Sequence, residues 1–195
     1  EDATVFDFDS ASSDYIDCGD SDTFSFGNGS SDSAFSVSAW CYIDTLSNFI
    51  VFTKGVYPTT GEWHIRMTGA NQMHLVLYDT NFYQAAIINT TLSTGQWYHF
   101  AFTYDGSGGT SANAGIKGYQ NGVEQTMTLA SSGSYAAMTN GTAPLYIGKN
   151  NTSYADGKIS NAQIWNTELS ASEVTTLYNS GVPLTGTQPQ AANLK

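Results

Sequence analysis

The acidic side chains are the first residues to consider, because a pair of carboxylates can hydrolyse a glycosidic bond. A retaining glycosidase holds its two carboxyl groups about 5 Å apart, so both must project from one face of the fold. The five glutamates are scattered along the sequence: Glu1, Glu62, Glu124, Glu168 and Glu173. Asp7 and Asp9 alternate onto one face, but no neighbouring acid completes a hydrolase pattern. The sequence therefore predicts no catalytic residues and no enzyme.

The histidines offer no clearer catalytic or metal-binding pattern. His64, His74 and His99 fall in three separate strand-like runs, and their spacing matches no zinc signature. We expect imidazoles that are packed or hydrogen-bonded on sheet faces. The glycine-rich run from 104 to 115 lacks the lysine and the following helix of a phosphate-binding loop, so it is predicted to be a plain loop.

Aromatic residues next to turns are the best candidates for ligand binding, because an exposed ring can stack on the face of a sugar. Amides or carboxylates near such rings would hydrogen-bond the hydroxyl groups. The candidates that this reasoning selects are Tyr57, Trp63, Tyr83 and Tyr154. The alternative for each is an aromatic side chain that is partly buried at the rim of the core. Trp40, Trp97 and Trp165 lie within strand patterns and are predicted to be packing residues.

The charge balance excludes two classes of partner. Six Lys and Arg residues stand against 17 Asp and Glu residues, which gives a net charge of −11. Nucleic acids and anionic membranes bind through clustered cations, so neither is expected as a partner. No apolar run approaches the ~18 residues that a membrane-spanning helix requires. A chain of 195 residues with 13% aromatic residues is expected to build one packed domain.

Short runs of alternating apolar and polar residues, separated by turns, predict antiparallel strands over most of the chain. They are "TVFDFDSASSDYIDCG", "FSVSAWCYI", "NFIVFTKG", "EWHIRMTG", "QMHLVLYD", "YQAAIINT", "GQWYHFAFTYDG", "IKGYQNGVEQTM", "APLYIGKN" and "GKISNAQIWN". Asn121-Gly122 is a type I′ hairpin signal, because both positions need positive φ. Such a succession of strands and turns predicts an all-β fold, an antiparallel sandwich of two sheets.

A short C-terminal helix follows the last strand. Ser170 and Glu173 have the spacing of a capping box, and Leu169 and Val174 that of a hydrophobic staple. Gly181 and Pro183 are expected to end the helix. We therefore predict one domain over residues 1–182 and a linker or tail over residues 183–195, which has little core-forming pattern.

The only cysteines, Cys18 and Cys41, lie in two different strand patterns. Alternation places both side chains towards the core. Two buried free thiols and one disulfide bridge are both compatible with this spacing.

Several of these runs occur together, and in the same order, in a known family. The blocks are "FDFDSASSDYIDCG", "FSVSAWCYI", "GQWYHFAFTYDG", "GYQNGVEQ", "PLYIGKN" and "GKISNAQIWNTELSASEVTTLY". The chain resembles the laminin-G-like and pentraxin-like jelly rolls of the concanavalin A-like lectin/glucanase superfamily, over nearly all of residues 5–181. The resemblance implies a jelly-roll sandwich whose last strand runs into a short helix. Laminarinase-type glucanases of this fold carry E-x-D-x-x-E along one strand, which this chain lacks.

The resemblance also implies a structural calcium ion between the loop after the first strand and the last strand. The matching positions are Asp9, Asp14 and the Ser160-Asn161 pair, with Asp9, Asp14 and Asn161 as expected ligands. The family often has aspartate where this chain has Ser160 and Asn161, and that change lowers the affinity for calcium. The acidic cluster of the pentraxin double-calcium loop is replaced by the uncharged or basic residues 149–152.

Three functions follow as hypotheses. The first is a non-catalytic recognition or adhesion module that binds a glycan or a cell-surface polysaccharide. The second is an architectural decoration, spacer or fibre domain without a ligand, and the third is a degenerate glycoside hydrolase. The composition is also similar to that of tandem jelly-roll proteins of marine bacteria and their phages. We therefore expect an extracellular or virion-surface location, with other domains of the same larger protein as partners.

Overall fold

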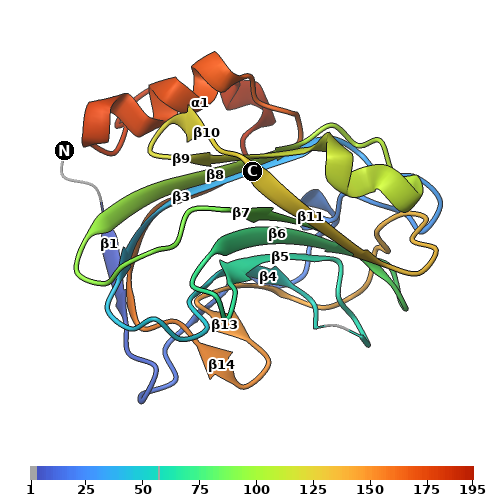
Figure 1. Cartoon of the computed structure of the whole chain (residues 1–195), viewed down its shortest axis with the longest axis horizontal. Helices are drawn as coiled ribbons and strands as arrows, with labels where there is room; N and C mark the ends of the chain where they lie inside the picture. Colours follow the sequence, from blue (N-terminus) through green and yellow to red (C-terminus); the bar gives the residue numbers. More distant parts are fainter. Residues whose placement is uncertain (1–3, 57) are drawn as a thin grey trace.

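Two antiparallel sheets packed face to face form the body of the molecule (Figure 1). The structure is a computed structural model and describes residues 4–56 and 58–195. The six-stranded sheet has the order β1 (Val5–Phe8), β15 (Gly157–Trp165), β3 (Phe35–Ile43), β8 (Trp97–Tyr104), β9 (Ile116–Gln120), β10 (Val123–Glu124). The seven-stranded sheet has the order β11 (Met127–Ser132), β7 (Tyr83–Ile88), β6 (Met73–Tyr78), β5 (Trp63–Met67), β4 (Ile50–Lys54), β12 (Leu145–Ile147), β2 (Ile16–Asp17). The predicted two-sheet sandwich, with the order of a jelly roll, is confirmed.

Smaller elements connect and flank the sheets. They are the two-stranded β13 (Lys149–Asn150) and β14 (Ser153–Tyr154), the helix α1 (Ala171–Tyr178), and the 3-10 turns η1 (Asp22–Phe24), η2 (Gly109–Gly115), η3 (Asn179–Gly181) and η4 (Ala191–Asn193). The turn between β9 and β10 has positive φ at both Asn121 and Gly122, as its sequence predicts. Within the described part of the chain, no helix is long and apolar enough to cross a bilayer.

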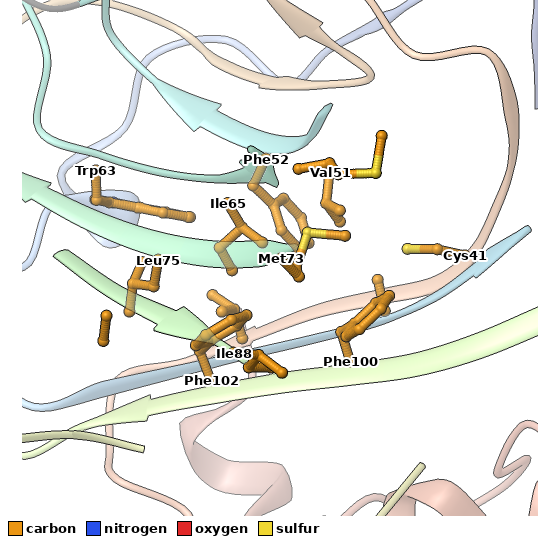
Figure 2. Close-up of a cluster of buried hydrophobic side chains, with 14 of the residues drawn as sticks. Cys41, Val51, Phe52, Trp63, Ile65, Met73, Leu75, Ile88, Phe100 and Phe102 are labelled. Carbon is orange, nitrogen blue, oxygen red and sulfur yellow. The ribbon is translucent and has the colours of Figure 1, made fainter. Parts of the chain in front are cut away.

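The core lies between the two sheets, where alternate residues of facing strands interdigitate. Figure 2 shows Phe100 and Phe102 of β8 pointing towards Ile65 and Met73 of the opposite sheet. All four side chains are at most 3% exposed. Burial of side chains of this size stabilises the fold by about 1.5–3 kcal/mol each, so this layer supplies much of its stability.

Helix α1 covers the outer face of the six-stranded sheet (Figure 1). Ser170 and Glu173 form the predicted capping box, and Leu169 and Val174 are both buried in a small cluster beneath the helix. The α-helix ends at Tyr178, three residues before the predicted Gly181, and a 3-10 turn continues from Asn179 to Gly181. Asn179 adopts the left-handed conformation there, with φ +46° and ψ +46°.

The C-terminal segment packs onto the same cluster, although the sequence suggested a linker or tail over residues 183–195. Leu184 and Leu194 are partly buried against it, and Leu194 forms a β-bridge with Trp165. The indole N–H of Trp165 donates to the carbonyl of Pro189 at 2.9 Å. These contacts make residues 183–195 part of the packed structure.

The two cysteines have different environments, and both are free thiols. Cys41 is fully buried in β3, as predicted. Cys18 is exposed, so the prediction that it faces the core is wrong. The strand β2 is only two residues long and lies at the edge of its sheet, so alternation does not extend to Cys18.

Candidate functional site

Polar and aromatic side chains converge on the outer face of the seven-stranded sheet. In β5, Trp63, Ile65 and Met67 point into the core, so the alternate residues His64 and Arg66 point outwards. The register sets Arg66 opposite His74 of β6 and sets Tyr78 opposite Tyr83 of β7. Alternation in three neighbouring strands thus brings these side chains to one surface.

This surface is hollowed by two adjoining cavities of about 330 and 220 Å³, which share His64, Arg66 and Tyr78. We call the combined depression the Arg66 groove. The larger cavity is lined by those three residues with Thr68, His74, Val76, Tyr83, Ala85, Ile87 and Ala130. The smaller is lined by the same three with Val56, Asn150, Asn151 and Ser153. The groove thus runs from the β6–β7 region to the β13–β14 hairpin.

The floor of the Arg66 groove is a short hydrogen-bonded chain. His64 Nε2 lies 3.0 Å from His74 Nε2 and accepts from Arg66 Nε at 3.3 Å. Burial lowers the pKa of His64 well below 6.5 and lowers that of His74 to about 3, and the charge of Arg66 acts in the same direction. Both imidazoles are therefore neutral near pH 7, and Arg66 carries the positive charge of the groove.

Aromatic rings form one wall of the larger cavity. Tyr78 and Tyr83 are in edge contact, with ring centroids 6.4 Å apart and planes inclined by 65°. Tyr83 is half-buried, while Tyr78 is 7% exposed. Tyr83 therefore lies where a stacking residue is needed, and ligand binding by it stays a prediction.

Tyr154 belongs to a different cluster. Tyr15, Tyr146 and Tyr154 surround the ammonium group of Lys149, whose nitrogen lies 3.8, 4.8 and 5.8 Å from their ring centroids. Tyr154 follows Ser153, which lines the groove, but it is not itself a lining residue. The structure therefore does not bring Tyr154 and Tyr83 together, and sugar binding at Tyr154 stays a prediction.

Trp63 is fully buried, with 0% of its surface exposed, and it packs against Phe26 and Phe35. Its indole N–H donates to the carbonyl of Phe24 at 2.9 Å. The prediction that Trp63 stacks on a sugar is therefore wrong, because the inward alternation of β5 places it in the core. Tyr57, the remaining aromatic candidate, lies outside the described residues.

The predicted calcium ligands are separated by the strand register. Phe8 pairs with Gly157 and Val5 pairs with Ser160, so Asp9 and Asn161 lie at opposite ends of the β1–β15 ladder. At about 3.3 Å per residue, this is a separation of roughly 15 Å. A single ion bridging Asp9 and Asn161 is therefore excluded by the geometry.

Each of the three predicted calcium ligands makes hydrogen bonds within the protein. The Asp9 carboxylate accepts from Ala11 N and Ser12 Oγ, both at 2.8 Å, and Asp14 Oδ2 accepts from Asp9 N at 3.1 Å. The bonds from Ser12 Oγ and Ala11 N lower the pKa of Asp9. Asn161, at a bulge with φ +47°, donates to the carbonyl of Leu184 at 3.1 Å.

Over residues 4–56 and 58–195, no three His, Cys, Asp or Glu side chains are grouped to hold a metal ion. Calcium binding at the loop of Asp9 and Asp14 alone stays a prediction. Melting temperatures measured with and without EDTA test it.

The most deeply buried charges form a separate cluster around Lys54. Its ammonium group lies 2.6 Å from Asp20 and 3.6 Å from Glu62. Burial raises the pKa of Glu62, as a general acid would require, but Glu62 is 0% exposed. Its carboxyl group also accepts from Gly141 N at 2.9 Å. A fully enclosed carboxyl group cannot reach a glycosidic oxygen, so this cluster serves the fold.

A third hollow, of about 250 Å³, lies on the opposite sheet beside Trp40, Trp97 and Pro183. Trp97 is 38% exposed, so the prediction that it is a packing residue is wrong. Ser160 is the one hydroxyl side chain lining this hollow, and it already donates to the carbonyl of Thr4 at 2.8 Å. The hollow therefore offers an apolar surface with little hydrogen bonding for a sugar.

Sequence reasoning missed Arg66, His64, His74 and Tyr78 as members of one site. The histidines were expected on sheet faces, and His64 and His74 are indeed hydrogen-bonded there. The sequence feature that could have indicated this site is the set of outward-facing residues in the alternating runs "EWHIRMTG" and "QMHLVLYD". Their convergence depends on the register between β5 and β6, which the sequence does not state.

The family model described as the concanavalin A-like lectin/glucanases superfamily, of laminin-G type, matches residues 10–175. The chain belongs to this family. None of the curated proteins compared with the sequence matches it.

Solved structures with this fold include three distant relatives. Domain 4 of AbnA, an extracellular arabinanase from Geobacillus stearothermophilus, solved with arabinotriose, is 23% identical, with a TM-score of 0.58 over 84% of this chain and 72% of that chain. The binding domain of Paraclostridial Mosquitocidal Protein 1 is 15% identical, with a TM-score of 0.65 over 91% of this chain and 45% of that chain. A heptameric pentraxin from Limulus polyphemus is 14% identical, with a TM-score of 0.51 over 84% of this chain and 81% of that chain. These similarities concern the fold.

Proposed function

We propose that the chain is a non-catalytic glycan-binding module and that the Arg66 groove holds the sugar. The observation that carries this proposal is the groove itself, with Tyr83 in the larger cavity, Asn150 and Asn151 in the smaller one, and Arg66 lining both. An aromatic ring supplies a face for stacking, while the guanidinium and amides supply hydrogen bonds to hydroxyl groups.

The relatives support the same function. Domain 4 of AbnA was solved with arabinotriose bound, and the mosquitocidal protein match is a binding domain. Both are portions of larger proteins. We infer that this chain likewise acts as one module of a larger extracellular or virion-surface protein, where several weak sites bind together by avidity.

The absence of catalysis is part of the proposal. Of the two carboxyl groups beside Lys54, Glu62 is fully buried and cannot act on a substrate. We expect reducing-end assays on β-glucan, arabinan and agar-type polysaccharides to stay at background. Turnover that disappears when one carboxylate is replaced would contradict this.

Binding is tested on a glycan array with the wild-type protein and Tyr83→Ala. Tyr83 is half-buried at the rim, so its removal should weaken binding while the fold is retained. Trp97→Ala is the matched control, because it removes a partly exposed aromatic from the opposite sheet. If no glycan binds, the architectural alternative is favoured; if Trp97→Ala alone abolishes binding, the site lies on the other face.

A further inference from the structure

We propose that the ligand of the Arg66 groove is an acidic sugar, and that Arg66 binds its carboxylate or sulfate group. This inference rests on the proposed glycan-binding function and specifies the chemical class of the ligand. The shared chemistry is an oxyanion attached to a sugar ring. It follows from the charge, the contacts and the placement of Arg66.

Arg66 is the only arginine in a chain with a net charge of −11, and no carboxylate among the described residues forms an ion pair with it. The other cations of the sheets differ. Lys54, Lys117 and Lys158 each lie beside a carboxylate, and Lys149 lies over tyrosine rings. A half-buried cation without a counter-ion is costly, and a bound anion would relieve that cost.

The hydrogen bonds of the groove floor orient the guanidinium group. Arg66 Nε donates to His64 Nε2, which therefore cannot carry a proton, so His74 Nε2–H is the donor in the 3.0 Å contact between the imidazoles. His64 is thus a positioning residue. Within the described part of the chain, the two terminal NH₂ groups of Arg66 have no protein acceptor, so they can form the two parallel bonds that a carboxylate or sulfate accepts.

The lining of the groove fits an anion. None of its residues is acidic, although the chain has 17 Asp and Glu residues. Asn150, Asn151 and Ser153 line the smaller cavity beside Arg66 and can donate hydrogen bonds without adding charge. Salt screens the repulsion from carboxylates outside the lining over about 10 Å.

The test uses matched probes that differ in charge alone. Isothermal titration is performed with tetragalacturonate and its methyl ester, and with a sulfated galactan oligosaccharide and its unsulfated parent. We expect at least one acidic probe to bind about tenfold more tightly than its neutral partner. A preference confined to the first pair identifies a uronic acid, and one confined to the second identifies a sulfate ester; either supports the proposal.

Three variants test whether Arg66 causes the preference for acidic over neutral probes. Arg66→Gln should bind both members of a pair equally. Arg66→Lys keeps the positive charge but lacks the planar guanidinium group that donates two parallel hydrogen bonds. It should therefore retain part of the preference for acidic probes. Lys117→Gln, which removes a cation from the other sheet, should bind like the wild type.

Equal affinity of acidic and neutral probes for the wild type would overturn this inference and leave the proposed function intact. A preference that survives in Arg66→Gln, or that Lys117→Gln also abolishes, would overturn it as well. If none of the probes and no glycan on the array binds the wild type, the proposed function itself is contradicted.

Discussion

At the scale of single residues, three buried histidines make the stability of the fold depend on pH. Burial lowers the pKa of His74 to about 3 and that of His99 to about 4, and it lowers the pKa of His64 well below 6.5. The unfolded chain therefore binds more protons than the folded chain as the pH falls below 6.5. The free energy of unfolding should then decrease by about 1.4 kcal/mol per pH unit for each histidine.

Two buried carboxyl groups act in the opposite direction. Burial raises the pKa of Asp32 and of Glu62, so the folded state retains their protons and gains stability as the pH falls through these raised values. We expect the three histidines to dominate between pH 6.5 and about 5, because three groups that destabilise the fold on acidification oppose only two that stabilise it. The stability is then highest above pH 6.5 and decreases on acidification.

Urea denaturation at pH values from 7.5 to 5 measures this dependence, with His99→Gln as the variant. His99 accepts or donates at Ser38 Oγ (2.8 Å) and lies far from the Arg66 groove, on the other sheet. In this variant, the free energy of unfolding should decrease on acidification by about 1.4 kcal/mol less per pH unit than in the wild type. A wild-type stability that is constant over this range would contradict the assignment of three buried neutral histidines.

Trp63 allows a second prediction at this scale, because the structure makes it a core residue. Trp63→Phe leaves the carbonyl of Phe24 without its indole donor, so the free energy of unfolding should fall by about 1–3 kcal/mol. Trp97→Phe is the matched control, since Trp97 is 38% exposed, and its effect should stay within about 0.5 kcal/mol. Chemical denaturation of both variants measures the two losses in free energy of unfolding. Equal losses would contradict the burial of Trp63.

At the scale of elements, the N-terminus of α1 depends on its capping box. Ser170→Ala removes the side-chain acceptor of Glu173 N and one partner of the Glu173 carboxylate, so it should destabilise the protein by about 1 kcal/mol. Thr176→Ala, on an exposed position of the same helix, should have little effect. Thermal unfolding of both variants gives the comparison, and an unchanged melting temperature for Ser170→Ala would contradict a structural role for the helix cap.

The elements themselves were largely predictable, because alternation and capping are local signals. The strand from Phe35 to Ile43 and the capping box at Ser170 appear where the sequence places them. The bulge at Asn161 was not predictable, because it arises from a register shift between β15 and β3. That shift directs the Asn161 amide to Leu184 rather than to an ion.

At the scale of the whole molecule, the C-terminal segment closes the cluster beneath α1. Deleting residues 184–195 removes Leu184, Leu194 and the acceptor of the Trp165 indole. The truncated protein should melt at a lower temperature, and its tryptophan emission should shift to longer wavelength as Trp165 becomes hydrated. An unchanged melting temperature and emission would contradict the packed position of this segment.

The candidate site illustrates the limit of sequence reasoning at this scale. Tyr83 was predicted from its position next to a turn, and it does line the Arg66 groove. Arg66 and Tyr78 were not predicted, because they reach the groove only through the pairing of β5 with β6 and of β6 with β7. Trp63 was predicted as a ligand-binding aromatic, but it lies in the core, on the other side of its strand.

The location of a bound sugar tests the central claim most directly. Backbone amide chemical shifts are recorded by NMR while the tightest glycan from the array is added to the ¹⁵N-labelled protein. The account predicts that the shifted amides cluster on β5, β6 and β7 and on residues 149–154. Changes confined to the hollow beside Trp97 or to Tyr15 and Tyr146, or no change at saturating glycan, would contradict binding in the Arg66 groove.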